Sequence, residues 1–186
     1  MKGVIFNLLE HVVTEAHGSD TWETLLDDTG LDGAWTSVGS YPDEDLLALV
    51  AAASARLDIP ANDLVRWFGK SALPLLADRY AEFFEGHAGL ASFLPTLNDV
   101  IHAEVRKLYP EAIVPTFAFV EANDTHVVMA YDSPRKMCAL AEGFIEGAAE
   151  QFREKITIDQ PECMLRGDAR CLLVVDIAES HTTSGD

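Results

Sequence analysis

The stretch Tyr131-Asp132-Ser133-Pro134-Arg135 lies where the hydrophobic pattern of the chain changes from that of a strand to that of a helix. The alternating run that ends at Tyr131 is typical of a strand, and the run from Lys136 onward repeats at helical spacing. In an extended backbone, Tyr131, Ser133 and Arg135 point to one face, where two hydroxyls and a guanidinium suit a carboxylate or phosphate. The spacing also allows a simpler interpretation, in which Ser133 caps the following helix.

The hydrophobic pattern changes a second time near Pro110. Before it, apolar residues recur at helical spacing and predict amphipathic helices over residues 3–16, 21–26, 43–57, 60–68, 73–84 and 92–108. After it, alternation predicts a β-hairpin that turns at Asn123-Asp124, a long helix over residues 135–152, and strands over residues 156–158 and 171–177. These elements predict an α+β fold, with a helical N-terminal lobe and a roughly four-stranded antiparallel sheet that has a long helix inserted.

Length and composition fit one domain over residues 1–178, because 186 residues with 48% hydrophobic content suffice for one substantial core. We expect a helical lobe to about residue 110, a sheet lobe over residues 111–178, and a disordered tail over residues 179–186. The net charge of −18 argues against nucleic acid and an anionic membrane surface as partners. No run approaches the ~18 apolar residues of a membrane span. Three cysteines form no disulfide framework, so we expect a cytoplasmic protein without membrane insertion.

His102 is the histidine with a helical and mostly apolar setting, between Ile101 and Val105 in the predicted helix over residues 92–108. A lone histidine in such a helix is usually a core residue, although the same side chain also serves as a metal ligand. The chain lacks the H-E-x-x-H, G-x-S-x-G and phosphate-binding glycine motifs. Its many carboxylates lie mainly at helix starts and outer faces, so the residues indicate no acid–base pair.

Four features resemble the H-NOX family, the haem nitric oxide/oxygen-binding domains. The opening Met1-Lys2-Gly3-Val4-Ile5-Phe6-Asn7 is similar to the start of that family, and Leu97-Asn98-Asp99-Val100-Ile101-His102 looks like its proximal-histidine helix. Pro115 matches the proline that contacts the porphyrin, and Tyr131, Ser133 and Arg135 match the tyrosine-x-serine-x-arginine signature. The resemblance covers about residues 1–178 and implies heme b as the cofactor, held between the two lobes.

The resemblance also implies what these residues do. His102 would be the heme axial ligand, since a neutral imidazole commonly ligates haem iron. The two propionates would bind Tyr131, Ser133 and Arg135 through charge-assisted hydrogen bonds. Apolar residues would form the walls of the heme pocket, with ordinary core packing as the alternative: Ile5, Leu9, Pro115, Leu140 and Phe144.

Ligand choice follows from the same resemblance. Oxygen on ferrous haem needs a hydrogen-bond donor on the distal side, and oxygen-binding members place a tyrosine for this where the present chain has Leu140. Leu9 and Ala72 stand where a tryptophan and an asparagine would extend that network, and none of these side chains can donate. We therefore expect nitric oxide and carbon monoxide to bind without a stable oxygen complex. Nitric oxide should also break the bond between the iron and His102.

The three cysteines, Cys138, Cys163 and Cys171, match three ligands of a zinc site found in some members of the family. The fourth position, a histidine in those members, is Gln160, and glutamine is a poor zinc ligand. A water molecule or Asp159 could complete the site. The alternatives are three reduced thiols, or a redox disulfide between two of them.

The leading hypothesis for the function is a haem-based nitric oxide sensor rather than an enzyme. Because the sequence ends soon after the region of resemblance, we expect it to regulate a separate polypeptide. Stand-alone bacterial members imply a histidine kinase or a cyclic-di-GMP enzyme as that partner. The alternatives are a gas-storing or gas-detoxifying haem enzyme, a haem-free helical adaptor that binds another anion at residues 131–135, and a redox- or zinc-responsive sensor based on the cysteines.

Overall fold

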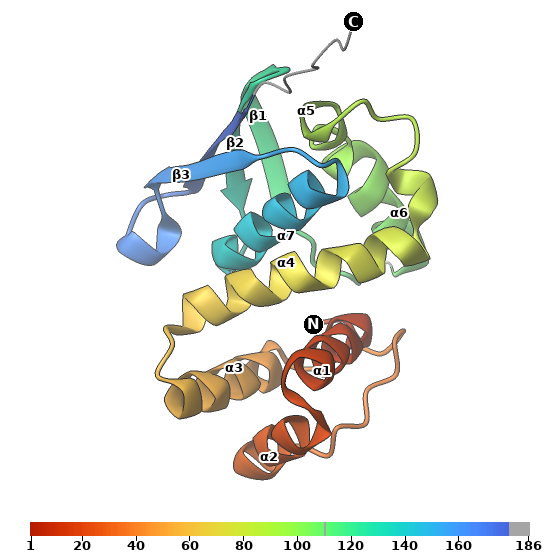
Figure 1. The fold of residues 1–186 in the computed structure, drawn as a ribbon, viewed down its shortest axis with the longest axis vertical. Coiled ribbons are helices and arrows are strands. Elements are labelled where there is room, and N and C mark those ends of the chain that lie inside the picture. Colours follow the sequence, from red (N-terminus) through yellow and green to blue (C-terminus); the bar gives the residue numbers. More distant parts are fainter. Residues whose placement is uncertain (110, 179–186) are drawn as a thin grey trace, which may run out of the picture.

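The computed structural model describes residues 1–109 and 111–178 and confirms the α+β fold (Figure 1). Residue 110 and the expected tail over residues 179–186 lie outside the described residues. None of the described helices is both long enough and apolar enough to cross a membrane. The helices are α1 (Gly3–His17), α2 (Ser19–Thr29), α3 (Asp43–Leu57), α4 (Ala61–Arg79), α5 (Leu90–Phe93), α6 (His102–Leu108) and α7 (Cys138–Gln151), with shorter turns η1 (Ala81–Phe83), η2 (Leu97–Ile101) and η3 (Met164–Arg166).

The sheet has the strand order β1–β2–β4–β3, and each neighbouring pair is antiparallel. β1 (Thr116–Asn123) and β2 (His126–Asp132) form the predicted hairpin, in which Phe117 lies opposite Tyr131. β4 (Cys171–Ile177) pairs with β2 on one side and with β3 (Ile156–Glu162) on the other. β1 is therefore an edge strand, whose outer backbone groups can bond to side chains from elsewhere in the chain.

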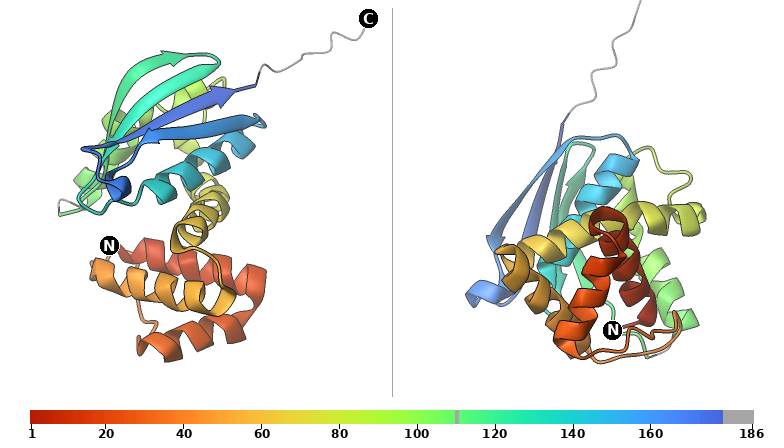
Figure 2. Two further views of the ribbon diagram at one scale, coloured as in Figure 1. Left: turned by 90° about the vertical axis from the view of Figure 1, so that its left-hand side faces the viewer. Right: turned by 60° about the horizontal axis from the view of Figure 1, so that its bottom comes forward.

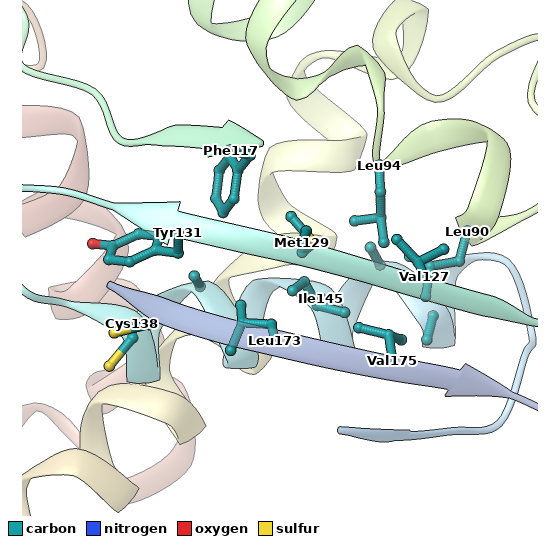
Figure 3. Close-up of a cluster of buried hydrophobic side chains, with 14 of the residues drawn as sticks. Leu90, Leu94, Phe117, Val127, Met129, Tyr131, Cys138, Ile145, Leu173 and Val175 are labelled. Atoms are coloured by element: carbon teal, nitrogen blue, oxygen red, sulfur yellow. The ribbon is translucent and has the colours of Figure 1, made fainter. Parts of the chain in front are cut away.

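A first hydrophobic core lies between the sheet and α7. Val127, Met129 and Tyr131 alternate along β2 and point to the same face, as period-two side chains do. Figure 3 shows this row above Ile145 of α7, with Leu173 and Val175 of β4 beside it and Leu90 of α5 at one end. The strand pattern in the sequence thus determines which face of the sheet is covered by helices.

A second core is entirely helical and occupies the opposite end of the molecule, where α1, α2 and α3 pack against one face of α4 (Figure 1). Phe6 is fully buried at its centre and stacks on Trp35, with ring centroids 4.6 Å apart. Phe144 of α7 packs against both cores. The two cores therefore meet at α4 and α7.

α4 and α7 cross in direct backbone contact, as the side view in Figure 2 allows the reader to follow. A Cβ atom on Gly143 would lie 2.0 Å from the carbonyl oxygen of Arg66, and one on Gly69 would lie 2.7 Å from that of Leu140. Glycine permits this approach because it has no side chain. α4 is thus fixed to α7, while its other face contributes Phe68 to the helical core.

Two helix predictions are wrong. Residues 60–68 and 73–84, predicted as two helices, fall mainly in the single helix α4, which continues through Pro74. A proline removes one helical hydrogen bond, but buried side chains on both sides of it, Phe68, Leu73 and Ala77, keep the helix packed. Residues 92–108, predicted as one helix, are interrupted at Leu94-Pro95: α5 ends at Phe93, and the π-helical turn η2 continues directly into α6.

Candidate functional site

His102 is the first residue of α6, directly after η2, and its backbone N–H donates to the carbonyl of Leu97. Its imidazole stacks on the ring of Phe117 in β1, with centroids 5.9 Å apart and an interplanar angle of 22°. Phe117 also contacts Tyr131 of β2, with centroids 5.6 Å apart. The fold therefore brings His102 and Tyr131, which are far apart in the sequence, onto one aromatic ring.

The surroundings of His102 keep its imidazole neutral. Burial is the main cause that lowers the pKa of His102 to about 4, and Arg106 acts in the same direction, while the carbonyl of Pro115 partly opposes them. Nδ1 is buried and has no hydrogen-bond partner among the described residues. A neutral imidazole with an uncommitted ring nitrogen is the form in which histidine ligates a metal, so His102 fits the ligand of a haem iron.

Tyr131 and Ser133 are buried at the end of β2, with 3% and 4% of their surfaces exposed. The Tyr131 hydroxyl accepts a hydrogen bond from the backbone N–H of Met137 at 3.2 Å, and burial raises the pKa of the phenol. The Ser133 hydroxyl accepts the backbone N–H of Arg135 at 3.3 Å. Because α7 begins at Cys138 and has no side-chain cap, the interpretation of Ser133 as a helix cap is wrong.

The guanidinium of Arg135 is held from two sides. Nε donates to Oδ2 of Asp43 at 2.6 Å, and Nη1 donates to the carbonyl of Ile113. The other carboxylate oxygen of Asp43 accepts a hydrogen bond from the amino group of Met1 at 2.6 Å. Burial alone would raise the pKa of Asp43, but the amino group and Arg135 outweigh it and hold that pKa below its usual value. Arg135 is thus already paired with a carboxylate of the protein.

The predicted apolar pocket residues of α1, α4 and α7 belong to the helical core or pack against it: Ile5, Leu9, Ala72, Leu140 and Phe144. Leu9 and Ala72 are buried, and the others are half-buried. Pro115 lies apart from this group, half-buried before β1, where its carbonyl faces His102. The structure therefore places these apolar residues at the helical core, while Pro115 lies beside His102.

The three cysteines form a buried cluster in which all sulfur atoms lie within 4.8 Å of one another. The sulfur of Cys163 is 3.7 Å from that of Cys138 and 3.9 Å from that of Cys171. Burial raises the pKa of the Cys138 thiol, and raises that of Cys171 to about 12. For Cys163, burial opposes ionisation, but the backbone N–H of Leu165 and the neighbouring thiols outweigh it and lower the pKa. Three sulfurs at this spacing suit one soft or borderline metal ion.

Gln160 lies beside this cluster, at the place where a fourth ligand is expected. Its side-chain amide partly offsets the effect of burial on the pKa of Cys138. Its Nε2 is buried without a hydrogen-bond partner among the described residues. A cavity of about 220 Å³ adjoins Gln160, Cys138 and Cys163 and is large enough for water. Asp159 is exposed and does not join the sulfurs, which corrects the expectation that it could complete a metal site.

Sequence reasoning missed two polar residues that the structure places at this site. Asp43, interpreted as a helix-start acid, binds both Arg135 and the amino terminus. Asn98 forms hydrogen bonds with the backbone of Phe117. An aspartate among three successive acids and an asparagine in a helix carry no sequence signal of such long-range partners, so neither could be identified before folding.

Comparison with a protein-family model gives a match to the family described as Haem-NO-binding, over residues 2–160. A structurally similar protein is an H-NOX protein from S. oneidensis in the Fe(II)NO ligation state. It is 34% identical, the match covers 96% of this chain and 100% of that one, and the TM-score is 0.89.

Two further solved structures agree with this match. An Fe(II) unliganded H-NOX protein from K. algicida is 26% identical, with 97% of this chain and 98% of that chain covered and a TM-score of 0.88. An H-NOX domain from Shewanella oneidensis in the Fe(II)CO ligation state is 34% identical, with 96% and 99% covered and a TM-score of 0.86. The similarity extends over nearly the whole length of each protein.

Proposed function

The chain belongs to the Haem-NO-binding family, and from this premise we propose that it is a haem-based nitric oxide sensor with His102 as the axial ligand. The observation that carries the proposal is the state of His102, which is neutral, half-buried and without a partner at Nδ1 among the described residues. We assign residues 1–178 to this one haem domain. Heme b would supply an iron that binds diatomic gases.

The polar residues after β2 would hold the carboxylates of the haem. Arg135 is the charged donor, while the protonated hydroxyl of Tyr131 and the hydroxyl of Ser133 add neutral hydrogen bonds. Arg135 already binds Asp43, so a haem carboxylate would have to share the guanidinium with it. Binding of haem would therefore change the contact between Asp43 of α3 and Arg135.

The apolar wall supports the choice of gas. Leu9, Ala72 and Leu140 lie in or against the helical core and offer no side-chain donor. Bound oxygen needs such a donor to stabilise its partial negative charge, whereas nitric oxide bonds strongly through the iron itself. The protein would therefore bind nitric oxide and carbon monoxide, and would form no stable complex with oxygen.

Release of His102 would be the signalling event. Binding of nitric oxide to the haem would release His102, so that α6 could relax against Pro115 and β1. The two cores, which meet at α4 and α7, would then shift relative to each other, and a ligand that favours one arrangement moves the population toward it. A separate cytoplasmic signalling protein, a histidine kinase or a cyclic-di-GMP enzyme, would recognise the changed surface.

A visible absorption spectrum of the purified protein tests this function. The expected result is a Soret band in the wild type and its loss in His102→Gly, with recovery when imidazole is added to replace the missing ring. His87→Gly, in the loop after η1, is the matched control and should keep the wild-type spectrum. A haem-free wild type would support an adaptor, and unchanged axial ligation in His102→Gly would exclude His102 as the ligand.

A second function, zinc or redox sensing, is favoured by the cysteine cluster. The three sulfurs already lie at distances that a single zinc ion can bridge after small movements. Water from the adjoining cavity would be the fourth ligand, because Gln160 is a poor one. Without zinc, a peroxide would oxidise Cys163 first, because its pKa is lowered from that of an ordinary thiol, and the Cys138 thiol would then displace water from the sulfenic acid to form the disulfide.

A further inference from the structure

Asn98, in the π-helical turn before His102, is bonded to β1 through both ends of its side-chain amide. Nδ2 donates to the carbonyl oxygen of Phe117, and the N–H of Phe117 donates to Oδ1 at 3.1 Å. β1 is an edge strand, and these are the backbone groups that a further strand would use. The amide of Asn98 therefore fixes η2 to the sheet at one residue.

Phe117 is also the residue on which the imidazole of His102 stacks. In a π-helical turn the backbone hydrogen bond spans five residues instead of the four of an α-helix. Such turns are rare and often occur at functional sites. Here the turn closes from His102 N–H to the Leu97 carbonyl. Asn98 and His102 consequently reach the same residue of β1, one through its backbone and the other through its ring.

The orientation of a metal-binding histidine depends partly on the partner of its second ring nitrogen. Such a histidine normally donates its second ring N–H to a carboxylate, carbonyl or water, which fixes the orientation of the ring. For His102, the backbone carbonyl of Pro115 faces the ring, while Nδ1 has no hydrogen-bond partner in the part of the chain that the structure describes. The orientation of the ring therefore depends on the backbone of η2, on the contact with Phe117 and on the carbonyl of Pro115.

We propose that Asn98 is a positioning residue for His102, because its amide holds η2 and Phe117 in the register that orients the imidazole. The proposal rests on the proposed role of His102 as the axial ligand. Loss of the two hydrogen bonds of the Asn98 side chain leaves η2 free to adopt the more common α-helical hydrogen bonding. That change removes one residue from the turn and rotates His102 relative to Phe117.

Resonance Raman spectra of the ferrous, haem-loaded protein test the proposal through the iron–histidine stretching band. Asn98→Leu, which removes both hydrogen bonds at similar side-chain size, should shift this band to lower wavenumber and broaden it. Asn98→Asp keeps the acceptor for the Phe117 N–H and loses the donor, so its shift should be smaller. Release of haem to an apo-globin scavenger should be roughly tenfold faster in Asn98→Leu, from two lost hydrogen bonds. Asn62→Leu, on the exposed face of α4, is the matched control and should match the wild type.

An unchanged band in Asn98→Leu would overturn the proposal, even if the melting temperature falls, because the residue would then only stabilise the fold. If Asn98→Leu does not fold, Asn98→Asp decides by the same band. An equal shift in Asn62→Leu would also overturn it. Failure of the proposed function gives a different result: the wild type would lack haem, or His102→Gly would keep the iron–histidine band unchanged. Either result would overturn the proposed function and the role of Asn98 together.

Discussion

Nε of Arg135 lies 2.6 Å from Oδ2 of Asp43, which joins the segment after β2 to the first turn of α3. The amino group of Met1 binds the other oxygen of the same carboxylate at 2.6 Å. One aspartate therefore links the amino terminus, a helix of the helical core and the arginine proposed to hold a haem carboxylate. A change in the partners of Arg135 would therefore alter a contact of the first turn of α3.

Replacement of Asp43 by asparagine should lower the free energy of unfolding by about 1 kcal/mol near neutral pH, as expected for a partly exposed ion pair. The folded-state pKa of Asp43 lies below 3.8, so this contribution is present above that value and is lost as the pH falls through the folded-state pKa. Urea denaturation of the haem-free protein at several pH values measures it. Glu44→Gln, exposed in the same helical turn, is the control, and equal losses in the two variants would contradict a specific role for Asp43.

Replacement of Arg135 by alanine should accelerate haem release by about one to two orders of magnitude, because a charged hydrogen bond contributes roughly 1.5–3 kcal/mol. The rate of haem release from Arg135→Lys should lie between those of the wild type and Arg135→Ala, since lysine keeps the positive charge but lacks the planar guanidinium. Transfer of haem to an apo-globin scavenger gives the rates. Arg170→Ala, which removes an exposed arginine paired with Glu162, is the control. A wild-type rate in Arg135→Ala would mean that this residue serves the Asp43 contact alone.

Replacement of Gly143 by alanine should be strongly destabilising, by about 3 kcal/mol or more, since overpacking of a rigid contact costs this much. The new Cβ would lie 2.0 Å from the carbonyl oxygen of Arg66, so α4 and α7 would have to separate. Gly69→Ala, whose Cβ would lie 2.7 Å from the carbonyl oxygen of Leu140, should be less harmful. Thermal unfolding of both variants checks the order, and a stable Gly143→Ala protein would show that the crossing of the two helices can adjust.

If the cysteine cluster holds zinc, the purified protein should contain about one zinc ion per chain, and Cys171→Ser should lose it. Elemental analysis together with thiol titration measures both quantities. A metal-free protein with three titratable thiols would support a structural role. A disulfide that forms only after oxidation would support a redox role instead.

The sequence predicted the sheet well, because the alternation of a strand is a local pattern. The alternating run that ends at Tyr131 predicted a strand, and the structure contains it as β2. The resemblance supplied His102, whose burial and lowered pKa the structure then explained. Such a pattern predicts structure because the period of a strand or helix determines which side chains share a face.

The remaining features depend on contacts between distant segments, which no local pattern reports. The sequence gives no sign that Asp43 would meet Arg135, or that Asn98 would bind the backbone of Phe117. The predicted break over residues 69–72 was wrong for the same reason, since the packing of α4 against α7 at Gly69 keeps these residues helical. The π-helical form of η2 also depends on the tertiary anchor that Asn98 provides.

The coordination of the ferrous haem in the presence of nitric oxide tests the central claim most directly. Electron paramagnetic resonance and visible spectra of the ferrous protein, recorded in nitric oxide and separately in air, report this coordination. We predict a five-coordinate nitrosyl haem, from which His102 has been released, and no stable oxygen complex in air. A six-coordinate nitrosyl haem that retains His102 at full nitric oxide occupancy would contradict the account.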